Sequence, residues 1–296
     1  MLTLASYLLI SALVVTTIWF VWQWWRIERA RREGTARVPR PADGAIGFVT
    51  NFFDTLGIGS FAPTTAIFKI FGRMPDEKIP GTLNVGHALP TLLMAVIFIG
   101  LVQVEPVTLV GMIVAAVAGA WMGAGVIARL PRRAIQIGMG IALLIASLLF
   151  VANNLQWLPG GGDALGLSGI PLVGAIAINF VLGALMTLGV GLYAPCLMLV
   201  SLLGMNPLAA FPIMMGSCAF LMPIGGIRFV RTERYDLRAS LGLAIGGIPG
   251  VLIAAFIVKS LPIDWLRWLV AVVVAYTALL MLWSVRPRVV VAQGNA

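Results

Sequence analysis

The sequence predicts an all-α polytopic membrane protein. It is expected to contain two inverted repeats, each with a broken re-entrant hairpin plus three transmembrane helices, preceded by one extra N-terminal transmembrane helix. Composition, an internal duplication and the placement of basic residues support this prediction. Of the 296 residues, 60% are hydrophobic and 10% are charged, and the mean hydropathy is +1.01. Soluble domains carry about 25% charged residues, so this much apolar side chain requires a bilayer.

Long apolar runs, interrupted by short polar loops, account for most of the chain. They occupy residues 2–25, 46–71, 83–104, 107–127, 134–151, 172–203, 208–229, 241–258 and 266–283. No charge precedes the first run and a basic cluster follows it, which indicates a retained helix rather than a signal peptide. The expected organisation is an N-terminal transmembrane helix (1–25), a basic cytoplasmic loop (26–43), a first repeat (44–152), a linker (153–169), a second repeat (170–284) and a cytoplasmic tail (285–296).

The two halves of the chain carry the same glycine motif. Residues 55–63 read TLGIGSFAP and residues 187–195 read TLGVGLYAP, 132 positions later. Gly72 and Gly204 keep the same spacing. Membrane transporters are often built from such repeats, with the substrate site at the repeat interface.

The basic residues decide between two topologies. If every apolar run spans the membrane, the clusters at 69–78 and 129–133 lie outside, against the positive-inside rule. If the runs 46–71 and 172–203 are re-entrant, every Lys and Arg except Lys259 and Arg267 lies inside. The re-entrant arrangement is therefore expected, with seven spans, the N-terminus outside and the C-terminus in the cytoplasm. The basic residues behind the net charge of +9 then act as topology signals in the cytoplasmic loops, and nucleic acid is not an expected partner.

The glycine motifs predict a helix break in the middle of each re-entrant segment. Each half-helix would be about 16 Å long, half of a hydrocarbon core of about 30 Å, so the two breaks would meet near the midplane. Free N–H groups and the positive helix dipole favour an anion there. The alternative is that these glycines only permit close helix packing. The residues expected to bind substrate at the breaks are Asn51, Thr55, Gly57, Gly59, Ser60, Thr187, Gly189, Gly191 and Tyr193.

Further candidates are one acid directly before the first motif and three polar residues elsewhere in the apolar segments. Asp54 is an acid at the centre of an apolar run, and such a group is a functional candidate. We expect it to be protonated when an anion binds and to couple transport to protons; a neutral Asp bonded to local backbone is the alternative. His87, the single histidine, suits proton coupling or anion binding, or is a satisfied buried side chain. Asn84 and Ser217 are expected to line the same cavity.

Other chemistry is not expected from this sequence. No phosphate-binding loop of the Walker type is present, and one His with two Cys makes a catalytic zinc or haem site improbable. Cys196 and Cys218 lie in apolar runs, as buried residues rather than disulfide partners. We expect no enzyme activity, no cofactor and no bound metal.

The two glycine motifs also resemble a known family. Residues 47–60 followed by Pro63, and residues 179–191 followed by Pro195, are similar to the paired motifs of the sulfite exporter TauE/SafE family, also called the toluene-sulfonate uptake permease family. The resemblance covers roughly residues 44–284 and leaves out the first helix. Ser60 and Leu192 stand where the family has a third glycine, and Asp54 and Thr55 replace small apolar residues.

The resemblance implies a substrate class that composition alone does not give. It implies a secondary transporter in the bacterial inner membrane that moves sulfite, thiosulfate or organosulfonates such as sulfoacetate without ATP, by export or uptake. Export is the expected direction. The alternatives are an anion channel, an uptake permease for a non-sulfur small organic anion, and a membrane-embedded enzyme or assembly factor. The expected partners are the small anionic substrate and membrane lipid, and a homodimer is an assembly left open.

Overall fold

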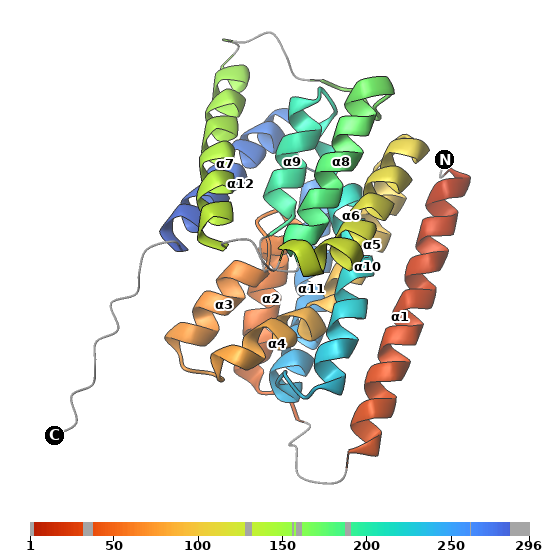
Figure 1. Cartoon of the computed structure of the whole chain (residues 1–296), viewed down its shortest axis with the longest axis vertical. Helices are drawn as coiled ribbons and strands as arrows, with labels where there is room; N and C mark the ends of the chain where they lie inside the picture. Colours follow the sequence, from red (N-terminus) through yellow and green to blue (C-terminus); the bar gives the residue numbers. More distant parts are fainter. Residues whose placement is uncertain are drawn as a thin grey trace, which may run out of the picture.

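The computed structural model describes residues 3–31, 38–127, 132–155, 157, 162–186, 191–260 and 262–284. Their regular elements are all helical. Figure 1 shows an elongated bundle with the first helix standing along one side. The first half contains α1 (Leu4–Ala30), α2 (Pro41–Thr55), α3 (Phe61–Ile70), α4 (Ile79–Gly86), α5 (Ala88–Leu101), α6 (Pro106–Ile127) and α7 (Arg132–Asn154). The second half contains α8 (Gly169–Met186), α9 (Tyr193–Leu202), α10 (Ala210–Arg231), α11 (Leu237–Ser260) and α12 (Ile263–Ser284).

Among the described residues, five helical stretches are long and apolar enough to cross a bilayer. They are Leu4–Ala30, Ile79–Leu101, Gly169–Met186, Pro207–Arg231 and Leu237–Val258. A multi-pass membrane protein is thus confirmed, whereas the expected seven spans are matched only in part. α8 is one of the five, whereas the sequence predicts it to be one arm of a broken segment.

The helix α1 extends further than the apolar run that predicts it. It continues to Ala30 instead of stopping near Trp25, because its last turns are held by polar contacts. Trp24 Nε1 donates to the Tyr235 hydroxyl (3.0 Å), which in turn donates to Glu28 Oε1 (2.7 Å). Burial, together with the hydrogen bond to Glu28, raises the pKa of Tyr235 above its ordinary value. This buried network fixes α1 to the loop between α10 and α11.

The helix pairs α2–α3 and α8–α9, here called hairpins, each have their outer ends held together. Asp43, in the first turn of α2, forms an ion pair with Arg73, which follows α3. In the second half, Ala164 precedes α8 and accepts a hydrogen bond from the Asn206 N–H, which follows α9 (2.9 Å). The α2–α3 pair and the α8–α9 pair lie in opposite halves of the molecule along its long axis (Figure 1).

Each hairpin packs mainly against a helix of the other half of the chain. α2 makes its most extensive contacts with α11, and α8 makes its own with α6. The glycines at these crossings correspond: Gly250 of α11 lies against the Phe48 carbonyl, and Gly119 of α6 lies against the Phe180 carbonyl. Phe180 is 132 positions after Phe48. Residues that correspond between the two halves of the sequence therefore also make corresponding contacts.

Candidate functional site

The first helix break follows from two glycines. Gly57 (φ 95°) and Gly59 (φ 88°) adopt left-handed backbone that L side chains rarely tolerate. The Gly57 N–H bonds to the Asp54 carbonyl (2.9 Å) and the Ile58 N–H bonds to the Phe53 carbonyl (3.1 Å), which is the Schellman pattern of a helix C-terminus. α2 therefore ends here, and the chain re-enters a helix at α3.

The second break has the same place in its half. α8 ends at Met186 and α9 begins at Tyr193, as α3 begins at Phe61, 132 positions earlier. Thr187 and Gly189 lie outside the described residues. Gly191 is exposed.

The two breaks converge in the middle of the bundle. A Cβ built on Gly57 would lie 3.8 Å from Leu197 of α9 and 3.8 Å from Met214 of α10. The Tyr193 side chain, at the start of α9, lies within electrostatic range of Asp54. A Cβ built on Gly59 or Gly191 would meet no atom within 4 Å. The described residues that flank the two breaks therefore lie near one another, and there is open space around Gly59 and Gly191.

The carboxylate of Asp54 occupies the N-terminus of α3. Asp54 is 3% exposed, and its side chain lies within hydrogen-bonding range of the backbone N–H and the hydroxyl of Ser60, the N-cap of α3. Because free N–H groups at a helix N-terminus attract anions, the protein's own carboxylate fills a position suited to an anion. The bond to the Ser60 N–H is also what the local-backbone interpretation of Asp54 expects.

His87 joins both arms of the first hairpin to the break between α4 and α5. Pro90 has no N–H to donate to the Gly86 carbonyl, which interrupts the helix at His87. The fully buried ring lies with Nδ1 3.1 Å from Asn51 Oδ1 on α2 and with Nε2 3.1 Å from Thr64 Oγ1 on α3. His87 therefore acts as a polar bridge across the hairpin.

The hydrogen bonds around His87 depend on its protonation. Asn51 Nδ2 donates to the Gly47 carbonyl (2.7 Å), so Asn51 Oδ1 accepts and His87 Nδ1 carries a proton. The Thr64 hydroxyl has one proton and two acceptors within reach, His87 Nε2 and the Ser60 carbonyl at 2.7 Å. All of these bonds are satisfied together only when both ring nitrogens are protonated, a charge that burial opposes.

The other predicted residues are placed differently. Thr55 is buried and donates to the Asn51 carbonyl (2.8 Å). Ser217 is buried and donates to the carbonyl of Ile213 on its own helix (2.7 Å). Asn84 donates to the carbonyl of Pro80 (2.9 Å) and lies beside Gly225 of α10, so it is not brought together with His87. The side chains of Asn84 and His87 have different partners, and their binding of substrate stays a prediction.

Two threonines that sequence reasoning missed complete the polar core. Thr64 bridges His87 and Ser60, and the Thr91 side chain lies within hydrogen-bonding range of the Tyr193 side chain. Each directly follows a proline that lies beside a helix break. A buried threonine one turn after a break was the available signal, but threonine is too common in membrane helices to be chosen by sequence alone.

The polar core consists of hydrogen-bonding side chains at the first helix break. Among the described residues, no group of three or more His, Cys, Asp or Glu side chains is placed to hold a metal ion. Cys196 and Cys218 are free and buried, as expected. An apolar helical chain whose buried polar groups gather at two helix breaks has the architecture of a membrane transporter.

The comparison with protein families agrees with that class. The family model described as sulfite exporter TauE/SafE matches residues 2–150 and 170–295. The chain belongs to the sulfite exporter TauE/SafE family. The match begins at residue 2, so the expectation that the resemblance leaves out the first helix is wrong. No curated protein and no solved structure matches the chain.

Proposed function

We propose that this protein is a secondary transporter that exports small sulfur-containing anions, sulfite or organosulfonates such as sulfoacetate, across the bacterial inner membrane. The membership of the family supports the substrate class. The observation that carries the mechanism is the Asp54 carboxylate held at the N-terminus of α3, opposite the second helix break. Transport would proceed by alternating access around these two breaks.

In this proposal the two halves are inverted repeats and the two hairpins are re-entrant. The closed ends of both hairpins, at Asp43–Arg73 and Ala164–Asn206, support entry and exit on one side of the membrane. The basic loops also meet at one end: Arg238 Nε donates to the Val38 carbonyl (2.9 Å). By the positive-inside rule that end is cytoplasmic, which leaves the N-terminus outside.

Asp54 would couple anion binding to protons. An ionised Asp54 both repels a substrate anion and occupies the donors of Ser60 that the anion needs. Protonation removes the repulsion and weakens the hold on Ser60, so proton and anion would bind together. His87 would add a second response, because its protonation decides whether the Thr64 hydroxyl bonds to His87 or to the Ser60 carbonyl.

The same co-binding favours a second candidate, uptake. When an anion travels with a proton, its direction follows the sum of the two gradients. An anion that has accumulated inside would be exported, whereas an inward proton gradient would drive uptake of a scarce external anion. The substrate gradient, rather than the site, would then set the direction.

The test is transport by proteoliposomes that contain the full chain. Sulfite, thiosulfate and sulfoacetate are compared with acetate, with and without an imposed pH gradient. We expect accumulation of a sulfur anion that follows the pH gradient. Asp54→Asn should bind the anion without responding to the gradient, whereas the exposed acid substitution Asp163→Asn should behave as wild type.

Two results would overturn parts of the proposal. If Asp54→Asn still responds fully to the pH gradient, Asp54 is not the coupling group. If acetate is moved and no sulfur anion is, the substrate class is wrong even though the helix breaks remain the site.

A further inference from the structure

The helix α1 contacts the bundle through a narrow stripe and leaves the rest of its surface uncovered. Its buried residues are spaced along one face: Ser6, Leu13, Phe20, Trp24 and Glu28. The other faces carry exposed apolar side chains, among them Ile18 (64% exposed) and Trp25 (55% exposed). This uncovered surface is where lipid meets the protein.

A shallow groove on the surface of α1 alone runs toward the basic end of the helix. It is lined by Thr17, Ile18, Val21, Trp22 and Trp25, and its surface is wholly apolar. These positions repeat at helical spacing, so they form one continuous strip along the helix axis. A strip of this kind suits an extended hydrocarbon chain.

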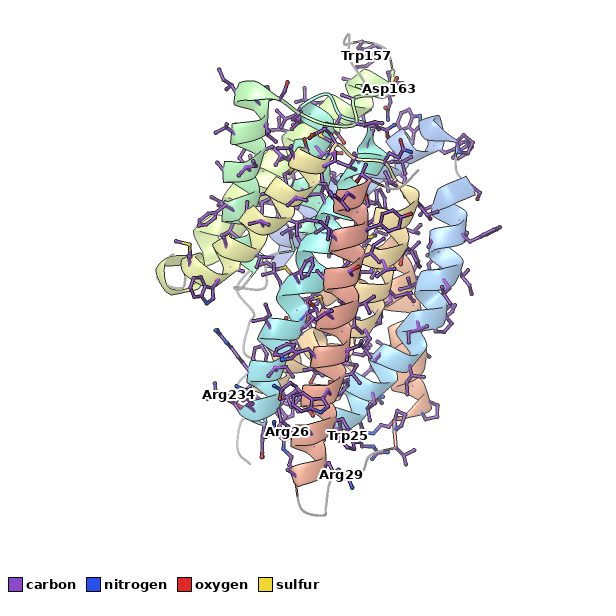
Figure 2. All side chains as sticks on the ribbon, turned by 90° about the vertical axis from the view of Figure 1, so that its right-hand side faces the viewer. Trp25, Arg26, Arg29, Trp157, Asp163 and Arg234 are labelled. Atoms are coloured by element: carbon purple, nitrogen blue, oxygen red, sulfur yellow. The ribbon has the colours of Figure 1, made fainter. Side chains whose placement is uncertain are left out.

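Two arginines stand at the end of this groove. Arg26 lies over the Trp22 ring at 5.4 Å and Arg29 lies over the Trp25 ring at 5.0 Å. Both arginines are exposed, and cation–π contact restrains each guanidinium beside the groove. Figure 2 shows Trp25, Arg26 and Arg29 together at this end of α1. The two guanidinium groups therefore lie directly next to the apolar groove.

We propose that this groove binds one phospholipid with an anionic headgroup. An acyl chain lies along Ile18, Val21 and Trp22, and the phosphate is bound by Arg26 and Arg29. Tryptophan side chains lie at the headgroup level of membranes, and anionic lipids attract arginines next to a membrane helix. The groove and the two guanidinium groups together match a lipid's two chemical parts.

Charge disfavours a second copy of the chain as the occupant. Two copies in one membrane have the same orientation, so a symmetric contact through this face would place Arg26 and Arg29 opposite themselves. Like charges facing one another are repulsive. An anionic lipid supplies the opposite charge at the same depth.

Lipid titration of the delipidated full chain, followed by native mass spectrometry, tests the proposal. The probes are phosphatidylglycerol and phosphatidylcholine with identical acyl chains. We expect wild type to prefer phosphatidylglycerol by roughly 25-fold, because each of the two arginines contributes about fivefold. The double substitution Arg26→Gln, Arg29→Gln should remove the preference. Arg234→Gln, an exposed arginine at the same end of the molecule, should keep it (Figure 2).

Four outcomes would overturn the proposal. One is equal binding of the two lipids by wild type, and another is an unchanged preference in the double variant. The third is displacement of bound phosphatidylglycerol by equimolar inorganic phosphate, which would identify a site for the free anion. Ile18→Cys supplies an independent check: a disulfide between two copies in phosphatidylcholine membranes would show that a second copy covers this face.

Discussion

The packing of α8 on α6 depends on a glycine that can be tested directly. The Cβ of Gly183→Ala would lie 2.6 Å from the carbonyl carbon and 2.7 Å from the Cα of Ala116 on α6. Ordinary contacts of a Cβ lie at 3.4–4 Å, so the two helices must separate by about 1 Å. A gap of that size removes about a quarter to a half of each dispersion contact across the interface. Overpacking of this kind costs about 1–3 kcal/mol of unfolding free energy.

A matched control lies on the same helix. Gly174→Ala adds the same methyl group where no atom lies within 4 Å, and alanine favours the helix over glycine by up to about 1 kcal/mol. Unfolding of the purified variants by a denaturing detergent should therefore place Gly183→Ala below wild type and Gly174→Ala at or above it. Equal midpoints for the two variants would refute the argument, because the substitutions differ only in what the methyl group meets.

Two further substitutions test the polar contacts. Thr64→Val removes the hydroxyl between His87 and Ser60. It should therefore destabilise the protein by roughly 1 kcal/mol and reduce the response of transport to a pH gradient. Thr64→Ser keeps the hydroxyl and should retain both properties; a serine variant as impaired as the valine variant would indicate a packing effect instead. Glu105→Gln should weaken the cap of α6 by roughly 0.5–1 kcal/mol. Partial burial acts to raise the pKa of Glu105, but hydrogen bonds from Thr108 and Val107 outweigh it and hold the pKa below its ordinary value of 4.5. The difference in unfolding free energy between Glu105→Gln and wild type should thus be full above about pH 4.5 and vanish as the pH falls through the lower folded-state pKa. Unfolding measured across this pH range checks the prediction. A difference that grows in acid would contradict it.

Much of the fold was predictable because it depends on local properties of the chain. Apolar composition identified a membrane protein, and the glycines of the duplicated motif marked both helix breaks. Gly72 and Gly204, which match at the repeat spacing, both adopt positive φ after α3 and α9. Such conformations depend on the absence of a side chain at the residue itself, so they can be predicted from the sequence without knowledge of distant residues.

The site was predictable only as a region. Asp54, Ser60, Asn51 and His87 lie together at the first break, as their positions in the motif and the next segment suggested. The sequence did not indicate that Asp54 bonds to Ser60. The assignment of Thr187 and Gly189 lies outside the described residues, and the binding roles of the others stay predictions.

The tertiary structure alone decided which polar groups meet. Thr64 was not predicted to contact His87, and Asn84, expected to line the same cavity as His87, lies beside Gly225 of α10. Helices that are apolar on most faces carry little periodic signal for their rotation about the axis. The partners of a buried polar side chain therefore follow from how the helices pack. In this protein one helix is interrupted at His87, and each hairpin is crossed by a helix of the opposite half. Residue type fixes where the backbone breaks and which segments enter the membrane, whereas long-range packing fixes the hydrogen bonds through which those breaks act.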